Sequence, residues 1–499
     1  MTVESGAKRV PEQQRLQSNT LSVPNCVALS AAVMAPVIGA VLNAPAASPN
    51  AGEALPLAFL VAFIVSLFVG NTVIQFSRRL PSSGSFYTYT SRGLGPLGGF
   101  FAGWLFFAAY ACLGIGLFTA TGSFAADYVT RTFHSNVPYW VFSFAFVALV
   151  TLLAVLSIRT SVRVDLALLS VEVTVFTLLA IIAIVEAGSG NSASAFLPSG
   201  SPKGVSGVGL GVVFGILSFV GFDAAATLGE ETKNPKRNVP LGVGAALLIV
   251  GAFYVLVMYG LVAGYHANSP KGLTAFTQDV NPFITLAHRD APWMEQIIDL
   301  AAIAGIFSAF LALQNTTARV IFSMAREGVL PTVLGGVHTR FHSPYMAIYA
   351  LNIFAIIVGL IMGAWIGPGA TGTYGFTGSI GTVAIVLVYI LSNAALVRFF
   401  WNDSTRNVIM HVVAPILGTL GLLFPLWSVA QPGQSYPYNY VPFIVIVWIV
   451  LGAGLYLYFR SSAPGKLAAL GSVLAEQEDN LVTDIETTGE PLIKHAPRL

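Results

Sequence analysis

Residues 31–41 read AAVMAPVIGAV and residues 215–224 read GILSFVGFDA, and each run interrupts a long apolar stretch. The first run contains Pro36 and Gly39, and the second contains Gly221. Proline removes a backbone donor and clashes with the preceding turn, while glycine costs conformational entropy in a helix. An opened backbone exposes polar groups that lipid cannot satisfy, so it persists only where protein covers it or a cavity adjoins it.

The composition indicates that these stretches cross a membrane. The 499 residues are 55% hydrophobic and only 9% charged, with a mean hydropathy of +0.76. Soluble domains carry roughly 25% charged residues. A spanning helix needs about 20 mostly apolar residues. We therefore expect an all-α integral membrane protein with twelve transmembrane helices, at residues 22–46, 54–76, 98–125, 137–158, 164–187, 206–229, 239–264, 297–320, 344–366, 373–397, 408–430 and 439–459.

The basic residues test this helix count, because loops should alternate between the two sides of the membrane. With the N-terminus in the cytoplasm, 20 of the 24 Lys and Arg residues fall inside. The remaining four fall outside and are Arg131, Lys203, Lys271 and Arg289. Cytoplasmic loops are enriched in Lys and Arg. The pattern predicts twelve spans with both termini in the cytoplasm.

The two interruptions fall in corresponding helices of two halves. Gly39 lies in the first predicted span and Gly221 in the sixth, five helices later. Paired interruptions of this kind are typical of transporters built from inverted repeats. The half-helix N-termini offer amides and a positive dipole end to a carboxylate. Alternatively, Gly and Pro only permit close packing or a kink here, since both are frequent in membrane helices.

Three motifs carry a family resemblance. Residues 221–240 read GFDAAATLGEETKNPKRNVP, residues 81–104 contain PSSGSFYTY, then GLG and GW, and residues 318–331 contain AR, then MAREGVLP. They resemble the signatures of amino acid–polyamine–organocation (APC) permeases, which include GF(E/D) followed by EE-x-KNP-x-R-x-x-P. The resemblance covers roughly residues 20–460. It implies a LeuT-like fold with a 5+5 inverted repeat, broken helices 1 and 6, and two peripheral helices.

The polar ends of the chain, the positions of the basic residues and the resemblance together predict domains. A cytoplasmic tail at 1–20 precedes a transporter domain at 21–460, and a second cytoplasmic tail covers 461–499. Within the domain, 22–187 forms the first repeat, 206–397 the second, and 408–459 the last two helices. Substrate is expected between the two broken helices, at Val37, Ile38, Gly39, Ala40, Ser218, Phe219, Val220, Gly221 and Phe222. The family usually has G-(S/T)-G at the first break, whereas this chain has Ile38-Gly39-Ala40.

Two carboxylates fall inside predicted spans, where an ionisable group is costly and marks function by default. Asp223 follows the second break, where relatives carry an acidic residue implicated in proton coupling or gating. Glu172 lies midway along the fifth span, where some proton-driven relatives carry a Lys. We expect both residues to serve proton coupling or gating. Alternatively, Asp223 is a structural acceptor for broken backbone and Glu172 is a packed, protonated group.

Glu230 and Glu231 stand at the cytoplasmic end of the sixth span. We expect them to form inner-gate or loop-anchoring ion pairs with Lys233, Arg237, Arg92 or Arg326, because these basic groups lie near the same membrane face.

The combined features predict a secondary active transporter that imports amino acids or related amines by proton symport and alternating access. An amino acid or polyamine exchanger is the alternative, and a channel or sensor is a third possibility. The chain carries no Walker A, HExxH, GxSxG or paired CxxC motif. We therefore expect no enzymatic activity, cofactor, metal or nucleic-acid partner. We expect a multi-pass protein of the cell membrane, embedded in the lipid bilayer of a bacterial inner membrane.

Overall fold

The computed structural model is a bundle of helices. It describes residues 21–462 except 81–83, 157, 230, 280, 327, 329, 432, 433 and 435. These residues form helices and one isolated bridge between Leu21 and Thr232, but no β-strand. The predicted N-terminal tail, Glu230 and the predicted C-terminal tail from residue 463 onward lie outside the described residues.

The long α-helices follow the predicted apolar stretches, whereas α5, α11 and α12 lie in segments between the predicted spans. Their bounds are α1 Val23–Met34, α2 Pro36–Ile38, α3 Ala44–Ala51, α4 Leu55–Arg79, α5 Phe86–Leu94, α6 Pro96–Phe133, α7 Tyr139–Leu156, α8 Ile158–Glu186, α9 Gly204–Phe219, α10 Pro235–Gly264, α11 Pro270–Gln278, α12 Pro282–Asp290, α13 Glu295–Arg326, α14 Tyr345–Ile366, α15 Gly375–Phe399, α16 Ala414–Val429 and α17 Val441–Ser462. Short 3-10 or π turns join several of them, including η2 Gly39–Asn43, η3 Gly52–Ala54, η7 Phe222–Leu228, η10 Ala370–Tyr374 and η11 Ile409–Val413.

Eleven segments of the described chain are long and apolar enough to cross a membrane. Ten of them each coincide with one predicted span. The eleventh, Val23–Arg79, has 57 residues and takes in the first two predicted spans. That is more than twice the roughly 20 residues that one crossing needs. The all-helical membrane architecture is confirmed, whereas the count of twelve and the inverted repeat stay predictions.

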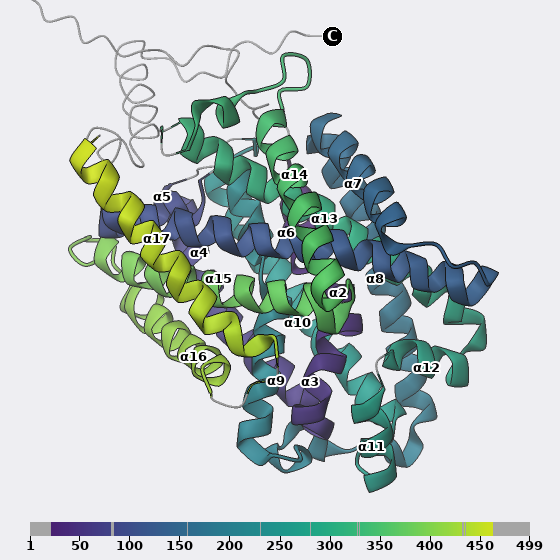
Figure 1. Cartoon of the computed structure of the whole chain (residues 1–499). Helices are drawn as coiled ribbons and strands as arrows, with labels where there is room; N and C mark the ends of the chain where they lie inside the picture. The colour runs from purple at the N-terminus through teal and green to yellow at the C-terminus, as the bar shows by residue number, and fades with distance from the viewer. Residues whose placement is uncertain are drawn as a thin grey trace, which may run out of the picture.

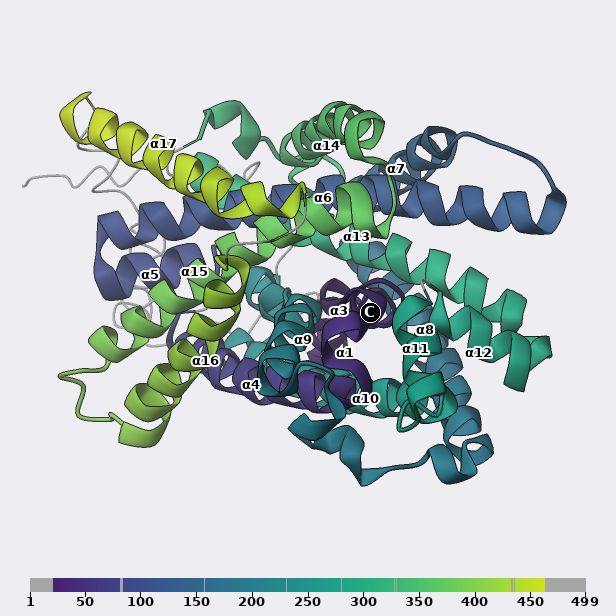
Figure 2. The same cartoon turned by 60° about the horizontal axis from the view of Figure 1, so that its bottom comes forward.

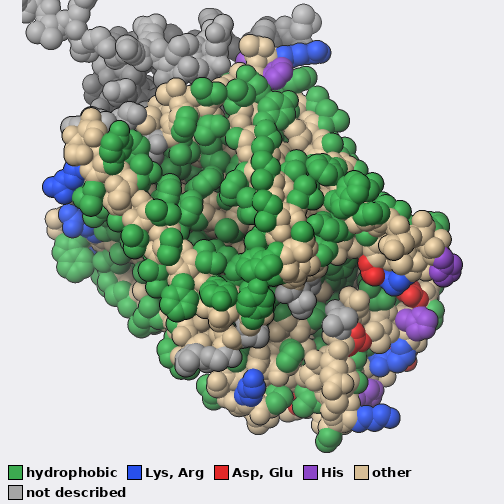
Figure 3. All heavy atoms as spheres, viewed as in Figure 1, with side chains coloured by type: hydrophobic (Ala, Val, Ile, Leu, Met, Phe, Trp, Pro, Cys, Tyr) green, Lys and Arg blue, Asp and Glu red, His purple; other side chains and the backbone are tan. Residues whose placement is uncertain are grey.

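The surface agrees with a membrane environment. Hydrophobic side chains are spread across the visible face in Figure 3, and the Lys and Arg side chains that it shows lie toward the margins. Helices α16 and α17 lie on the outside of the bundle (Figure 1) and expose apolar residues such as Leu420 and Phe443. Apolar surface on this scale marks contact with lipid or protein.

The interior positions the two interrupted helices. Helix α1 packs against α8, α10, α13 and η7, so the first break is enclosed on several sides. Beyond the breaks, α3 packs against both α9 and α11. Figure 2 shows these three helices close together at the end of the bundle that comes forward in that view.

Candidate substrate-binding site

The first interruption is centred on Ala35. Helix α1 ends at Met34, and Ala35 has φ +49° and ψ +69° in the left-handed region before Pro36 restarts the helix. Proline disfavours the α conformation of the residue before it, which explains a break at this position. Gly39 has helical torsion angles, with φ −55°. The break therefore lies just before the predicted segment, and Gly39 does not open the backbone.

The second interruption falls where the sequence places it. Helix α9 ends at Phe219, Val220 has extended torsion angles, and Gly221 has φ +103°. A left-handed residue without a Cβ is suited to glycine. A Cβ on Gly221 would also overlap the side chain of Val33 on α1. Backbone conformation and close approach to the first interrupted helix both require glycine here.

Ser30 of α1 satisfies backbone groups that the second break leaves open. Its hydroxyl donates to the Phe222 carbonyl at 2.7 Å and accepts from the Ala225 amide at 2.9 Å. Buried backbone groups need such partners, because an unpaired one costs about as much as a lost hydrogen bond. The two interrupted helices are thus joined through side chain and backbone.

Tyr254 of α10 joins the two breaks at a single point. Its hydroxyl lies 2.9 Å from the Met34 carbonyl oxygen, 3.2 Å from that of Ala35 and 3.0 Å from that of Ser218. A tyrosine hydroxyl has one proton to donate. Three carbonyl oxygens from the two interrupted helices therefore converge on one hydroxyl group. Because this hydroxyl has a single proton, it cannot donate a full hydrogen bond to all three.

Gly39 makes room for this tyrosine. A Cβ on Gly39 would overlap the edge of the Tyr254 ring and lie 2.5 Å from its hydroxyl oxygen. The Gly39 amide donates to the Ala35 carbonyl oxygen at 3.1 Å. The Gly39 amide, which the sequence predicts to bind a substrate carboxylate, therefore donates to a backbone carbonyl oxygen of the same chain in this conformation.

Asp223 is fully buried and faces α6. The Tyr110 hydroxyl donates to its Oδ1 at 3.0 Å. Its Oδ2 has no hydrogen-bond partner among the described residues. A buried carboxyl oxygen without a partner is costly when charged. This geometry is compatible with a group that gains and loses a proton, and with a structural acceptor.

Glu172 of α8 reaches the first interrupted helix. A Cβ on Gly305 of α13 would lie 2.9 Å from both the Glu172 Oε2 and the Val37 Cβ. The Glu172 Oε1 lacks a hydrogen-bond partner in the described part of the chain. The carboxyl group therefore sits where α8, α13 and the segment after the first break meet.

A cleft of about 1150 Å³ leads toward the two breaks. Its lining includes Val41 and Leu42 after the first break, and Phe214 and Leu217 before the second. Asp127, Lys203 and Asp279 also line it, near the ends of their helices or between helices. We call this space the vestibule. It lies on the side of the molecule that the sequence predicts to be extracellular.

The nine predicted substrate residues all lie in or beside the two breaks and are all buried. They do not line the vestibule; the neighbouring residues Val41 and Leu217 do. Sequence reasoning missed Tyr254, Ser30 and Tyr110. Each stands in an ordinary apolar run, and no local pattern distinguishes it from a packing residue.

A family model described as amino acid permease matches residues 21–453. The chain belongs to the amino acid permease family. This match confirms the resemblance to APC permeases that the motifs indicate. The permease is accordingly a membrane transporter and not an enzyme.

Several curated proteins are similar to the permease. The branched-chain amino acid permease BcaP of Bacillus subtilis (strain 168) is 26% identical over 425 residues, which cover 79% of this chain and 83% of BcaP. The methylthioribose transporter of the same organism is 26% identical over 77% of this chain and 81% of its own. The vacuolar cationic amino acid transporter 2 of Arabidopsis thaliana is 31% identical over 33% of this chain and 25% of its own.

Two solved structures share the fold. MhsT in complex with L-phenylalanine superposes with a TM-score of 0.52 at 14% identity, covering 83% of the permease and 99% of MhsT. A single-residue mutant of the manganese transporter of Eremococcus coleocola superposes with a TM-score of 0.53 at 12% identity, covering 92% of the permease and 98% of that transporter. Both are LeuT-fold transporters, and the permease has this fold.

Removal of the Tyr254 hydroxyl tests whether its contacts with the carbonyl oxygens of both breaks, here called the junction, matter for stability and transport. We expect Tyr254→Phe to lower stability by about 1–3 kcal/mol, because buried carbonyl groups lose their donor. We also expect slower uptake, since the two interrupted helices are no longer tied to α10. Melting temperature and initial uptake rate measure the two effects. Tyr458→Phe is the control, because Tyr458 is 61% exposed. Equal behaviour of the two variants would contradict the role of the junction.

Glu231 makes a buried ion pair with a residue that the sequence did not suggest. Its Oε1 lies 2.5 Å from the Nε of Arg319, and both side chains are about 2% exposed. Arg319 of α13 also donates to the Asn315 carbonyl oxygen at 2.7 Å. Arg319 is not among the partners expected from the loops. This pair ties the segment after η7 to α13.

Removal of one partner from this ion pair should be costly. We expect Arg319→Met to lower the free energy of unfolding by about 3–5 kcal/mol, because the buried Glu231 carboxylate loses the guanidinium group with which it pairs. Adding Glu231→Gln should recover most of the loss. Thermal unfolding in detergent compares the two variants. An equal loss in the single and double variants would show that the charge pair is not the cause.

Proposed function

We propose that the permease imports a neutral amino acid with an apolar side chain, by proton symport and alternating access. It would act in the cell membrane with both termini in the cytoplasm. The observation that carries the substrate class is the lining of the vestibule where it approaches the breaks. There the walls are Val41, Leu42, Phe214 and Leu217.

The distribution of charge supports a neutral substrate. The carboxylates among the described lining residues of the vestibule are Asp127 and Asp279, which lie away from the breaks in the sequence. Asp223 lies close to the second break but is fully buried and bonded to Tyr110. A cationic side chain transferred from water needs a compensating charge. The similarity to BcaP over most of both chains points the same way.

The converging carbonyl groups support recognition of an ammonium group. Met34, Ala35 and Ser218 present their carbonyl oxygens to one point, which the Tyr254 hydroxyl occupies in this conformation. An ammonium group has three donors, which suits several acceptors. Binding would then replace the tyrosine hydroxyl by the substrate, and displacement of Tyr254 would release α10 from both breaks. This exchange offers a physical route from binding to conformational change.

Proton coupling is supported by the placement of Asp223 and Glu172. Each is buried beside a different interrupted helix, and each has one carboxyl oxygen without a partner within the described residues. Movement of the interrupted helices would change the surroundings of both groups. A carboxyl group whose hydration changes during transport can take up a proton in one state and release it in the other.

Uptake into proteoliposomes tests the proposal. The panel is radiolabelled leucine, isoleucine, valine, phenylalanine, lysine, spermidine and methylthioribose, under an inward proton gradient, a sodium gradient, or preloading with unlabelled compound. We expect saturable accumulation of the apolar amino acids with the proton gradient alone. Uptake only into preloaded vesicles would establish an exchanger instead. Preferred uptake of lysine, spermidine or methylthioribose would overturn the substrate class, and non-saturating flux would indicate a channel.

A further inference from the structure

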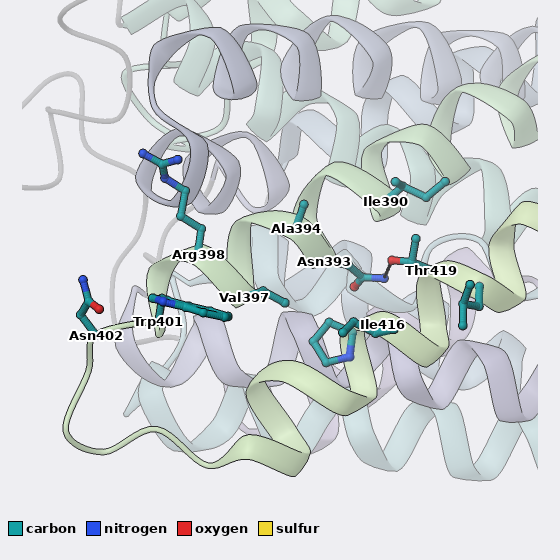
Figure 4. Close-up of a pocket in the computed structure, with 11 residues that line it drawn as sticks. Ile390, Asn393, Ala394, Val397, Arg398, Trp401, Asn402, Ile416 and Thr419 are labelled. Carbon is teal, nitrogen blue, oxygen red and sulfur yellow. Dashed lines mark hydrogen bonds between the residues drawn. The ribbon is translucent and has the colours of Figure 1, made fainter.

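A second hollow lies between α15 and α16, on the outer side of the bundle. It has a volume of about 810 Å³ and shares no lining residue with the vestibule among the described residues. Its walls include Ile390 and Val397 on α15 and Ile416 on α16 (Figure 4). Leu420 on α16 also lines it. Ile416 is 48% exposed and Leu420 is 58% exposed. A groove with exposed apolar walls on a membrane-spanning bundle faces the acyl chains of the bilayer.

One end of this groove is polar. Arg398, Trp401 and Asn402 line it where α15 ends. Figure 4 shows Trp401 directed toward Val397, with Asn402 beyond it at the outer end of the groove, and the Arg398 side chain extending to the other side of α15 from Val397 and Ile416. Tryptophan is enriched at the level of the lipid headgroups, and long basic side chains reach that level from within the apolar region. The groove therefore runs from the headgroup region into the apolar part of the bundle surface.

The charges around this end do not cancel. Asp403 forms an ion pair with Arg79 at 3.7 Å. Hydrogen bonds from Thr405, with a smaller contribution from Arg79, hold the pKa of Asp403 below its usual range, so this acid is ionised and already matched. Arg406 lies over the Trp401 ring at 5.6 Å. The guanidinium group of Arg398 has no hydrogen-bond or ion-pair partner among the residues that the structure describes, although its backbone carbonyl oxygen accepts from the Trp401 amide. The mouth of the groove thus carries an excess of positive charge.

We propose that this groove binds an anionic phospholipid. The phosphate group lies at the mouth, where Arg398 and the Trp401 indole N–H can donate to it, and an acyl chain lies between α15 and α16. Arginine pairs well with phosphate because its fork of donors matches the phosphate oxygens. Basic pockets between membrane helices on the cytoplasmic side recognise anionic headgroups. This site is independent of the transported substrate.

Lipid binding to the purified full-length permease tests the proposal. The protein in detergent is titrated with phosphatidylglycerol, phosphatidylcholine or glycerol phosphate, and bound lipid is counted by native mass spectrometry. We expect phosphatidylglycerol to bind at least about fivefold more tightly than phosphatidylcholine, the factor that one basic side chain near an anionic surface supplies. Glycerol phosphate should not bind, because it lacks the acyl chains that fill the groove.

Two variants assign the binding to this groove. Arg398→Gln should remove the preference for phosphatidylglycerol, whereas Arg460→Gln should keep it, because Arg460 is an exposed basic residue in the last turn of α17 outside the groove. Ala394→Trp should fill the groove and reduce the binding of both lipids, since Ala394 is exposed and lines it. Equal affinity for both lipids, binding of glycerol phosphate alone, or an unchanged preference in Arg398→Gln would each overturn the proposal.

Discussion

Replacement of Gly39 with valine should abolish uptake while the protein still inserts into the membrane. The reason is steric: a Cβ at this position overlaps the Tyr254 ring, whose hydroxyl binds carbonyl oxygens of both breaks. Overpacking of a filled interior costs about 1–3 kcal/mol and displaces the neighbouring groups. The displaced group here is the one that holds the two interrupted helices together. Initial uptake rate in proteoliposomes, normalised to the inserted protein, measures the effect.

The matched control is Gly454→Val, because no atom outside the local helix lies within 4 Å of a Cβ at Gly454. It makes the same change within a membrane helix, in a place with open space. A second substitution, Tyr254→Ala, removes the ring with which the valine side chain would overlap. The double variant Gly39→Val with Tyr254→Ala should therefore recover stability that Gly39→Val loses, although not full transport. Normal uptake by Gly39→Val would contradict the hypothesis that the two breaks form the substrate site.

The helices and their order could be predicted because apolar runs of sufficient length have few alternatives in a membrane. The second break is predictable for a related reason. Gly221 adopts φ +103°, which a residue with a side chain rarely does, so the residue type reports its conformation. At the first break the visible signal is Pro36, but the left-handed residue is Ala35. An alanine gives no indication in the sequence that it will adopt a left-handed conformation. The break occurs at Ala35 because the proline after it disfavours the α conformation there.

The contacts at the centre of the site could not be predicted. Tyr254 meets Met34 across 220 positions of sequence, and Arg319 meets Glu231 across 88. Such pairs depend on how the helices pack, which local pattern does not encode. Proximity along the loops suggests other partners for Glu231, whereas Arg319 projects from α13. Glu172 stands out in the sequence by its charge alone, and only packing places it beside Val37.

Replacement of Asp223 with asparagine should separate proton coupling from substrate exchange. Asparagine keeps an oxygen that can accept from the Tyr110 hydroxyl, but its side chain does not gain or lose a proton. We therefore expect the variant to fold and to exchange labelled for unlabelled substrate. Accumulation driven by a proton gradient should fall to the level without a gradient. Both activities can be measured in the same proteoliposome preparation, with and without preloaded substrate.

A structural role for Asp223 makes a different prediction, so the experiment can distinguish the two. If the carboxylate only accepts from Tyr110, then Asp223→Asn retains gradient-driven uptake and Tyr110→Phe is the damaging change. Glu172→Gln provides the parallel test on the other side of the site, because its carboxyl group lies beside the first interrupted helix. Loss of coupling in Asp223→Asn alone would place the proton at the second break. Loss in Glu172→Gln alone would place it between α8 and α13, and loss in both would mean that transport requires a proton exchange beside each interrupted helix.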